Sequence, residues 1–325
     1  MRTGTFLIAI FAALWAAPFA GASAGPLDEM RVFFQGFPTS LRNADPYVQA
    51  RVTDFATVTP PSPTKVSRLP RAPHLFLWAN RCQGGAGPCD ANQKPNRWRH
   101  NTTCLGGDGW REDRLTFTSP EAANACTLHQ LRSAARPFVS YDALERAAPA
   151  GCQFFGCPVA FNDVFLDLEA QDNRSSPQLV SLIKGMREIL EPTNRKLYIY
   201  TNPLSGPSTR KNGLLPNGIR PLVNVIDGIS ILLWAGNLKN GSILPDIADQ
   251  LALLTRHSYP LDKIFLVVDF NDLTMRHMAE AHRFMLRQPV LFVMVYRADL
   301  PVAEFGPERI GARKLRCLMD GFCPR

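Results

Sequence analysis

Short, almost continuous apolar runs recur along the chain from residue 74 onward. Runs of this kind are typical of strands that are covered on both faces, as in a parallel sheet. Seven runs stand out: His74–Ala79, Pro137–Tyr141, Val164–Glu169, Lys196–Thr201, Ile229–Trp234, Ile264–Asp269 and Val290–Tyr296. A weaker segment at Val32–Phe34 would bring the number of predicted strands to eight.

Helical patterns lie between several of these runs. The clearest covers residues 177–190, where apolar residues recur every three or four positions and so form one apolar face. Ser176 is placed to cap this helix, and Pro177 suits its first helical position. Further helices are expected at Ser119–Ala135, 245–256 and 273–287.

Strands that alternate with helices predict βαβ units and a parallel sheet. Eight such units suit a TIM-type (β/α)8 barrel, an α/β fold in which one strand is weak. The alternative is an open doubly wound sheet, which favours a glycine-rich phosphate loop after its first strand. Residues 81–87 (RCQGGAG) contain glycines but not the G-x-G-x-x-G pattern, so the barrel is favoured.

The first 24 residues predict a signal peptide. Arg2 precedes an apolar run that ends in Ala22-Ser23-Ala24, a typical cleavage pattern. The alternative is an uncleaved membrane anchor, although Pro18 and Gly21 interrupt the run. We therefore expect a secreted or periplasmic protein with no stable membrane anchor after processing. We also expect an N-terminal extension with a proline-rich linker over residues 25–73, and the barrel domain over residues 74–325.

All eight cysteines lie after the predicted cleavage site. An even number in an exported chain argues for disulfides. Short loops favour Cys82–Cys89, Cys152–Cys157 and Cys317–Cys323, which leaves Cys104–Cys126. A zinc site is the competing interpretation, but the spacings miss the Cys-x-x-Cys pattern.

The formal net charge of +8 favours acidic partners, such as polyanionic glycans. A solvated basic surface is the plainer alternative. The basic residues are scattered and lack the aromatic interleaving typical of nucleic-acid binding, so nucleic acid is not an expected partner.

In barrels of this type the active site lies at the carboxyl ends of the strands. Polar and aromatic residues gather at these ends, whereas the strand bodies are aliphatic. The candidate substrate-binding residues are Trp78, Asn80, Tyr141, Tyr200, Asn202, Trp234, Asn271, Tyr296 and Arg297. The candidate catalytic acids are Asp167, Glu169 and Asp269.

Asp167 and Glu169 are two positions apart in a strand, so both side chains point to the same face. Mutual repulsion would raise the pKa of one of them, so that it stays protonated near neutral pH. Glycosidic cleavage needs such an acid together with an ionised carboxylate that stabilises the positive sugar. The alternative is a structural pair that caps loop amides or holds an arginine.

The segment VFLDLE at residues 164–169 resembles the Asp-x-Glu strand end of the chitinase, hyaluronidase and barrel-lysozyme families. The resemblance implies that Glu169 is the general acid and that Asp167 orients an acetamido group of the substrate. It also implies an aromatic floor under a sugar, for which Trp234 is the candidate, and a contact from Tyr200 to the acetamido group. The two further acids of the chitinase pattern would fall at Asn162 and Phe165, which departs from that pattern.

Two of these residues also have structural interpretations. Asp269 could cap a helix that begins near Leu273 instead of serving as a third acid. Trp234 could be a core tryptophan.

The sequence therefore predicts an exported glycoside hydrolase that cleaves a polysaccharide containing N-acetylhexosamine or acidic sugars, without a cofactor or metal. One alternative is a non-catalytic barrel that binds glycans or a protein. Another is a hydrolase in which Asp167, Glu169 and Asp269 hold a metal ion. The histidines show no zinc-binding spacing, and there is no G-x-S-x-G motif for a serine nucleophile.

Overall fold

The structure is a computed structural model of the 325-residue chain. It describes residues 27–35, 41, 43–57, 74–78, 81–82, 98–99, 116–117, 128, 131, 162–168, 176–201, 219–296 and 302–323. The predicted signal peptide lies outside these residues.

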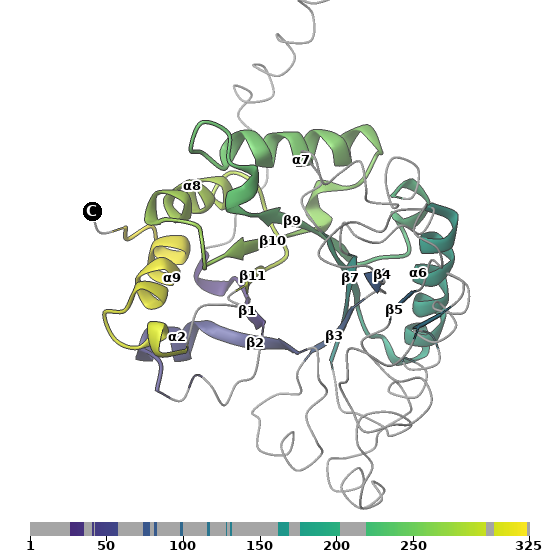
Figure 1. Cartoon of the computed structure of the whole chain (residues 1–325), viewed down its shortest axis with the longest axis horizontal. Helices are drawn as coiled ribbons and strands as arrows, with labels where there is room; N and C mark the ends of the chain where they lie inside the picture. Colours follow the sequence, from purple (N-terminus) through teal and green to yellow (C-terminus); the bar gives the residue numbers. More distant parts are fainter. Residues whose placement is uncertain are drawn as a thin grey trace, which may run out of the picture.

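Eight strands, all paired in parallel, close into a barrel (Figure 1). They are β1 (Val32–Gln35), β2 (Val52–Thr57), β3 (His74–Trp78), β7 (Val164–Leu168), β8 (Leu197–Thr201), β9 (Gly228–Leu233), β10 (Ile264–Asp269) and β11 (Val293–Tyr296). Each strand pairs with the next one in this order, and β11 returns to β1. The expectation of a TIM-type barrel of strands is therefore confirmed.

The strand predicted at Pro137–Tyr141 lies outside the described residues. In the barrel, β3 pairs directly with β7. The eighth strand is β2, a segment that the apolar pattern missed. Its polar residues Thr53 and Asp54 interrupt the apolar run. Asp54 is nevertheless buried, because it belongs to an ion-pair network instead of making apolar contacts.

Helices lie outside the ring of strands, from α6 through α7, α8 and α9 to α2 (Figure 1). The α-helices are α2 (Pro46–Arg51), α6 (Ser176–Leu190), α7 (Leu244–Arg256), α8 (Met275–Met285) and α9 (Ile310–Asp320). The short 3-10 helices are η1 (Leu27–Glu29), η3 (Glu191–Thr193), η5 (Arg220–Leu222), η6 (Ala235–Asn237), η7 (Leu261–Lys263) and η8 (Val302–Phe305). Among the helices described, none is long and apolar enough to cross a membrane.

Three of the predicted helices are confirmed as α6, α7 and α8. The helix expected at Ser119–Ala135 falls outside the described residues, except that Leu128 and Leu131 are helical. The α6 helix begins at Ser176 itself, one residue before the predicted start.

Alternation along the strands divides the core into two parts. One set of side chains faces the helices, such as Phe34, Leu166 and Val268. Their neighbours along each strand, such as Phe33, Phe165 and Val267, fill the barrel interior. Residues two apart in a regular strand share a face, so this division gives the inward-facing positions of the strands that carry no bulge.

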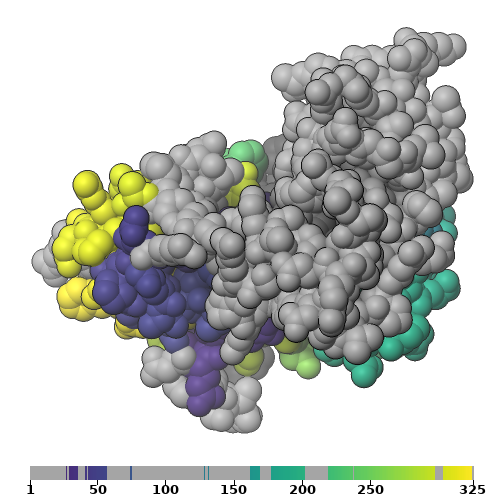
Figure 2. All heavy atoms as spheres, turned by 90° about the horizontal axis from the view of Figure 1, so that it is seen from below, coloured from purple at the N-terminus to yellow at the C-terminus, as the bar shows by residue number. Residues whose placement is uncertain are grey.

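The barrel begins before residue 74, where the sequence placed its boundary. Residues 27–57 supply β1, α2 and β2, and α2 packs against the C-terminal helix α9. Arg316 of α9 forms an ion pair with Asp45 at 2.8 Å, and the Tyr47 hydroxyl donates to Asp320 at 2.7 Å. Figures 1 and 2 show the two ends of the described chain side by side. The N-terminal segment is thus part of the barrel domain.

A small antiparallel sheet follows β3 in sequence, made of β4 (Arg81–Cys82), β5 (Trp98–Arg99) and β6 (Thr116–Phe117). Of the predicted disulfides, the structure contains Cys317–Cys323 at the end of α9. The side chains of the other six cysteines lie outside the described part of the chain.

Candidate functional site

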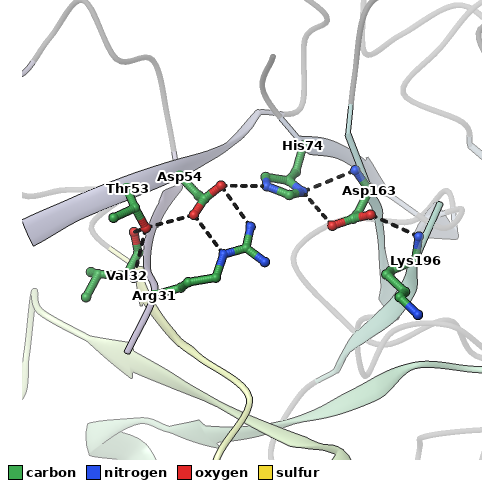
Figure 3. A network of polar contacts seen from close by, with 7 residues as sticks. All are labelled: Arg31, Val32, Thr53, Asp54, His74, Asp163 and Lys196. Carbon is green, nitrogen blue, oxygen red and sulfur yellow. Dashed lines mark hydrogen bonds and ion pairs between the residues drawn. The ribbon is translucent and has the colours of Figure 1, made fainter. Parts of the chain in front are cut away.

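A network of polar contacts lies at the amino ends of the strands (Figure 3). Asp54 of β2 accepts two hydrogen bonds from the guanidinium of Arg31, at 2.9 and 3.1 Å. Oδ1 of Asp54, one of the two oxygens that accept from Arg31, also lies 3.1 Å from Nε2 of His74. The pairing of β1 with β2 shifts register at this point, a bulge-like irregularity that re-aims side chains and turns Asp54 inward.

His74 links Asp54 to Asp163, which directly precedes β7. Nδ1 of the ring lies 3.2 Å from the backbone nitrogen of Asp163 and 3.4 Å from its Oδ2. A neutral ring accepts at Nδ1 from the amide, whereas a protonated ring donates from Nδ1 to the carboxylate. The imidazole therefore has a partner for Nδ1 in either protonation state. Asp163 also accepts from the backbone N–H of Lys196 at 2.9 Å.

The charged groups in this network stabilise one another's ionised forms. Burial disfavours the charged imidazole, but hydrogen bonds to Asp163 and Asp54 outweigh it and raise the pKa of His74. Burial likewise opposes ionisation of Asp54, yet hydrogen bonds from His74, Arg31 and Thr53 hold its pKa well below the usual range. Because residues at the amino end of a barrel serve stability, this network is structural.

The carboxyl ends of the strands carry the residues that the sequence singled out. Asp167 is two positions after the inward-facing Phe165, so it also points into the barrel, and it is buried. Trp78 of β3 and Tyr200 of β8 lie beside it in register on the two neighbouring strands. Tyr200 belongs to the interior cluster. The structure thus brings together Trp78, Asp167 and Tyr200 at one level of the barrel.

Asp269 occupies the equivalent place at the end of β10. It follows the inward-facing Val267 by two positions, is 3% exposed, and pairs in register with Tyr296 of β11. Its carboxylate accepts a hydrogen bond from the backbone N–H of Asn271 at 2.8 Å. Asp269 is not the cap of α8, because Thr274 and His277 form a capping box there.

Trp234 is not a core tryptophan, because 44% of it is exposed. It follows β9 directly in extended conformation, one position beyond the paired residues Leu233 and Val268. An exposed aromatic ring at the rim of a barrel is available to stack on a ligand. The loop that carries it is anchored to α8, since Glu280 accepts from Ser242 at 2.9 Å and from the Ile243 N–H at 3.0 Å.

The seam between β8 and β9 is a feature that the sequence did not predict. Their ladder comprises two register pairs near the amino end. Beyond it, Ser230 accepts from the Thr201 N–H and donates to the Thr201 carbonyl. Gln250 of α7 bonds both backbone groups of Leu232, at 3.3 and 3.0 Å. Side chains replace ladder bonds on this side of the barrel, a feature that has no local sequence signal.

Gln35 was also missed. It ends β1 and follows the inward-facing Phe33 by two positions. Its Oε1 atom is buried and has no hydrogen-bond partner among the described residues. A buried amide oxygen without a partner is costly, so it marks a place where a donor from a ligand would be stabilising. The signal that could have found it is a polar residue at the end of the weak strand Val32–Phe34.

Asn80, Tyr141, Glu169, Asn202 and Arg297 lie outside the described residues. Within the described part of the chain, no group of three or more His, Cys, Asp or Glu side chains could hold a metal ion.

No family model and no curated protein matches the sequence. Solved structures that are similar to the chain include a glucosidase and a chitinase. A glucosidase from Croceicoccus marinus aligns with a TM-score of 0.48 and 10% identity, covering 93% of this chain and 69% of that one. A chitinase from Chromobacterium violaceum ATCC 12472 aligns with a TM-score of 0.54 and 11% identity, covering 91% of this chain and 99% of that one. The chain therefore shares its barrel fold with that chitinase.

Proposed function

We propose that the protein is an exported glycoside hydrolase that cleaves a polysaccharide by carboxylate acid/base catalysis. The observation that carries this proposal is Asp167, a buried carboxylate that points inward at the carboxyl end of β7, beside Tyr200. Barrel enzymes place their chemistry at this end. The shared fold with a chitinase supports a polysaccharide substrate.

In the proposed mechanism Glu169 is the general acid, which protonates the leaving glycosidic oxygen. Asp167, one pleat deeper on the same face, stays ionised and keeps Glu169 protonated by repulsion. Asp167 also orients a substrate amide, which suits a substrate that contains N-acetylhexosamine. Asp269 is the third acid, and Trp234 stacks on a sugar ring at the rim.

Export remains part of the proposal, supported by the pattern of Arg2, the apolar run and Ala22-Ser23-Ala24. The net charge of +8 supports a substrate that carries acidic groups. N-terminal sequencing of secreted material should begin at Gly25, and material that begins at Met1 would contradict export by this signal.

The proposal is tested by screening a panel of glycans and then comparing Glu169→Gln with wild type. Glu169→Gln keeps the shape but removes the proton donor, so activity should fall by about 10²–10⁴-fold. Substrates with very good leaving groups need less protonation and should lose less. Glu188→Gln, at an exposed position of α6, is the matched control and should retain full activity.

Three outcomes would contradict the proposal. Full activity of Glu169→Gln on the best natural substrate would exclude Glu169 as the acid. Binding of several glycans without cleavage would make the protein a glycan-binding barrel. Loss of activity on chelation would favour a metal-dependent hydrolase instead.

A further inference from the structure

A buried lysine lies next to the turn that carries Asp269. Lys314 of α9 is 6% exposed, and its Nζ donates to the carbonyl oxygen of Phe270 at 2.6 Å. Phe270 directly follows Asp269, and its own N–H donates to the Tyr296 carbonyl at 2.9 Å. Lys314 thus reaches from the outer helix to the carboxyl end of β10.

A positive charge at this place calls for an explanation. Burying an ammonium group costs free energy, and a neutral carbonyl satisfies only one of its three N–H donors. A methionine of similar length would fill the same space without a charge. The compensation comes from carboxylates, since Lys314 interacts electrostatically with Asp269 and Asp272.

The two carboxylates differ in exposure. Asp272 is exposed, so water and salt screen its interaction with the lysine. Asp269 is buried, so its interaction with Lys314 is screened much less. Burial lowers the pKa of Lys314, and the two carboxylates oppose that effect. The main electrostatic partner of Lys314 is therefore Asp269.

Other titratable groups that face these elements have partners of their own. His282 of α8 bonds the Leu318 carbonyl at 3.0 Å. Asp45, before α2, pairs with Arg316, and Tyr47 of α2 bonds Asp320. Tyr296 of β11 lies beside Asp269 in register. The Cys317–Cys323 disulfide also joins the last turns of the helix that carries Lys314 to the segment that follows it.

We propose that Lys314 is a positioning residue of the candidate site, whose buried ammonium group holds the turn after β10 and keeps the carboxylate of Asp269 ionised. The inference rests on the proposed function, in which Asp269 is the third acid. Lys314 would thus act on the site from α9, a helix that lies outside the ring of strands.

The test separates the charge of Lys314 from its hydrogen bond. Lys314→Gln keeps a donor for the Phe270 carbonyl but removes the charge, and Lys314→Met removes both. The readout is the pH titration of Asp269 by NMR in protein labelled with [13C]aspartate, with the signal assigned by its loss in Asp269→Asn. In both variants the ionised carboxylate loses its cation, so the Asp269 signal should titrate at higher pH than in wild type. Lys314→Arg retains the charge and should return the titration toward wild type.

Lys263→Met is the matched control. Lys263 precedes the same strand, β10, at the opposite end and also donates from Nζ to a backbone carbonyl, that of Val223 at 3.2 Å. This variant should leave the Asp269 titration unchanged. On the glycan that wild type cleaves best, the acid limb of the pH–rate profile should move to higher pH in Lys314→Gln but not in Lys263→Met.

An unchanged Asp269 titration in Lys314→Gln would overturn the inference even if glycans are cleaved. If the titration moves but wild type cleaves no glycan, the coupling between Lys314 and Asp269 stands and the proposed function fails. If Lys314→Met does not fold, Lys314→Gln and Lys314→Arg decide the question alone.

Discussion

The two ends of the barrel hold buried carboxylates in different surroundings. At the amino end, Asp54 and Asp163 are bound to Arg31 and His74 in one connected network. At the carboxyl end, Asp269 accepts from a backbone amide and interacts electrostatically with the buried Lys314, and the same end carries the exposed Trp234 and the buried Oε1 atom of Gln35. The first arrangement holds strands together, whereas the second lies at the rim where we propose the chemistry. Similar residue types thus serve stability at one end and, in our proposal, chemistry at the other.

The largest effect on stability is expected at the amino end. Asp54→Asn removes the negative charge that pairs with both His74 and Arg31, and leaves the buried His74 with Asp163 as its remaining carboxylate partner in the network. Because Arg31 is half-exposed, the loss should be near the lower limit for buried pairs, about 3 kcal/mol. Urea denaturation measures it. A loss that is close to zero would show that the network does not hold β1, β2 and β3 together.

A smaller effect is expected from pH. The pKa of His74 is raised in the folded protein, so its contribution is fully present below about pH 6.5, the unfolded value. It is lost as pH rises through the folded pKa. The unfolding free energy should therefore decline on the alkaline side of pH 6.5, and His74→Gln should remove most of that decline. An identical pH dependence in the variant and in wild type would contradict the assignment.

The smallest effect is expected at the carboxyl end, and its sign is opposite. Gln35→Met removes a buried amide oxygen that has no described partner, so the protein should become more stable by about 1 kcal/mol. The same variant should bind the best glycan more weakly than wild type. Thermal unfolding and a binding isotherm measure the two effects. A drop in stability would show that the Gln35 oxygen has a partner in the folded protein.

The sequence predicted the parts of the barrel that rest on local pattern. The strands β3 and β7 to β11 were visible because their residues are covered on both faces and so are apolar. The strand ends also identified Asp167, Asp269 and Trp234 as residues at the carboxyl end of the barrel. In contrast, the apolar pattern missed β2, because its residues Thr53 and Asp54 are polar and form hydrogen bonds instead of apolar contacts.

What the sequence did not reveal depends on residues that are distant in the chain. Asp54, His74 and Asp163 each look ordinary in their own segments, and only the closure of the barrel brings them together. In the sequence, Lys314 lies in a segment with many charged residues and gives no sign of burial, although it is buried against the turn after β10. Gln250 likewise has no local signal, since its role depends on the gap in the ladder between β8 and β9.

The most direct test compares two aspartates at opposite ends of one strand, β7. Asp167→Asn should lower kcat/KM on the best glycan by about 10²-fold or more, because the carboxylate acts at the site, and should leave the unfolding midpoint almost unchanged. Asp163→Asn should lower the unfolding midpoint, because it breaks the network with His74, and should leave kcat/KM almost unchanged. Full activity in Asp167→Asn, or loss of activity without loss of stability in Asp163→Asn, would contradict the assignment of chemistry to the carboxyl end of the barrel.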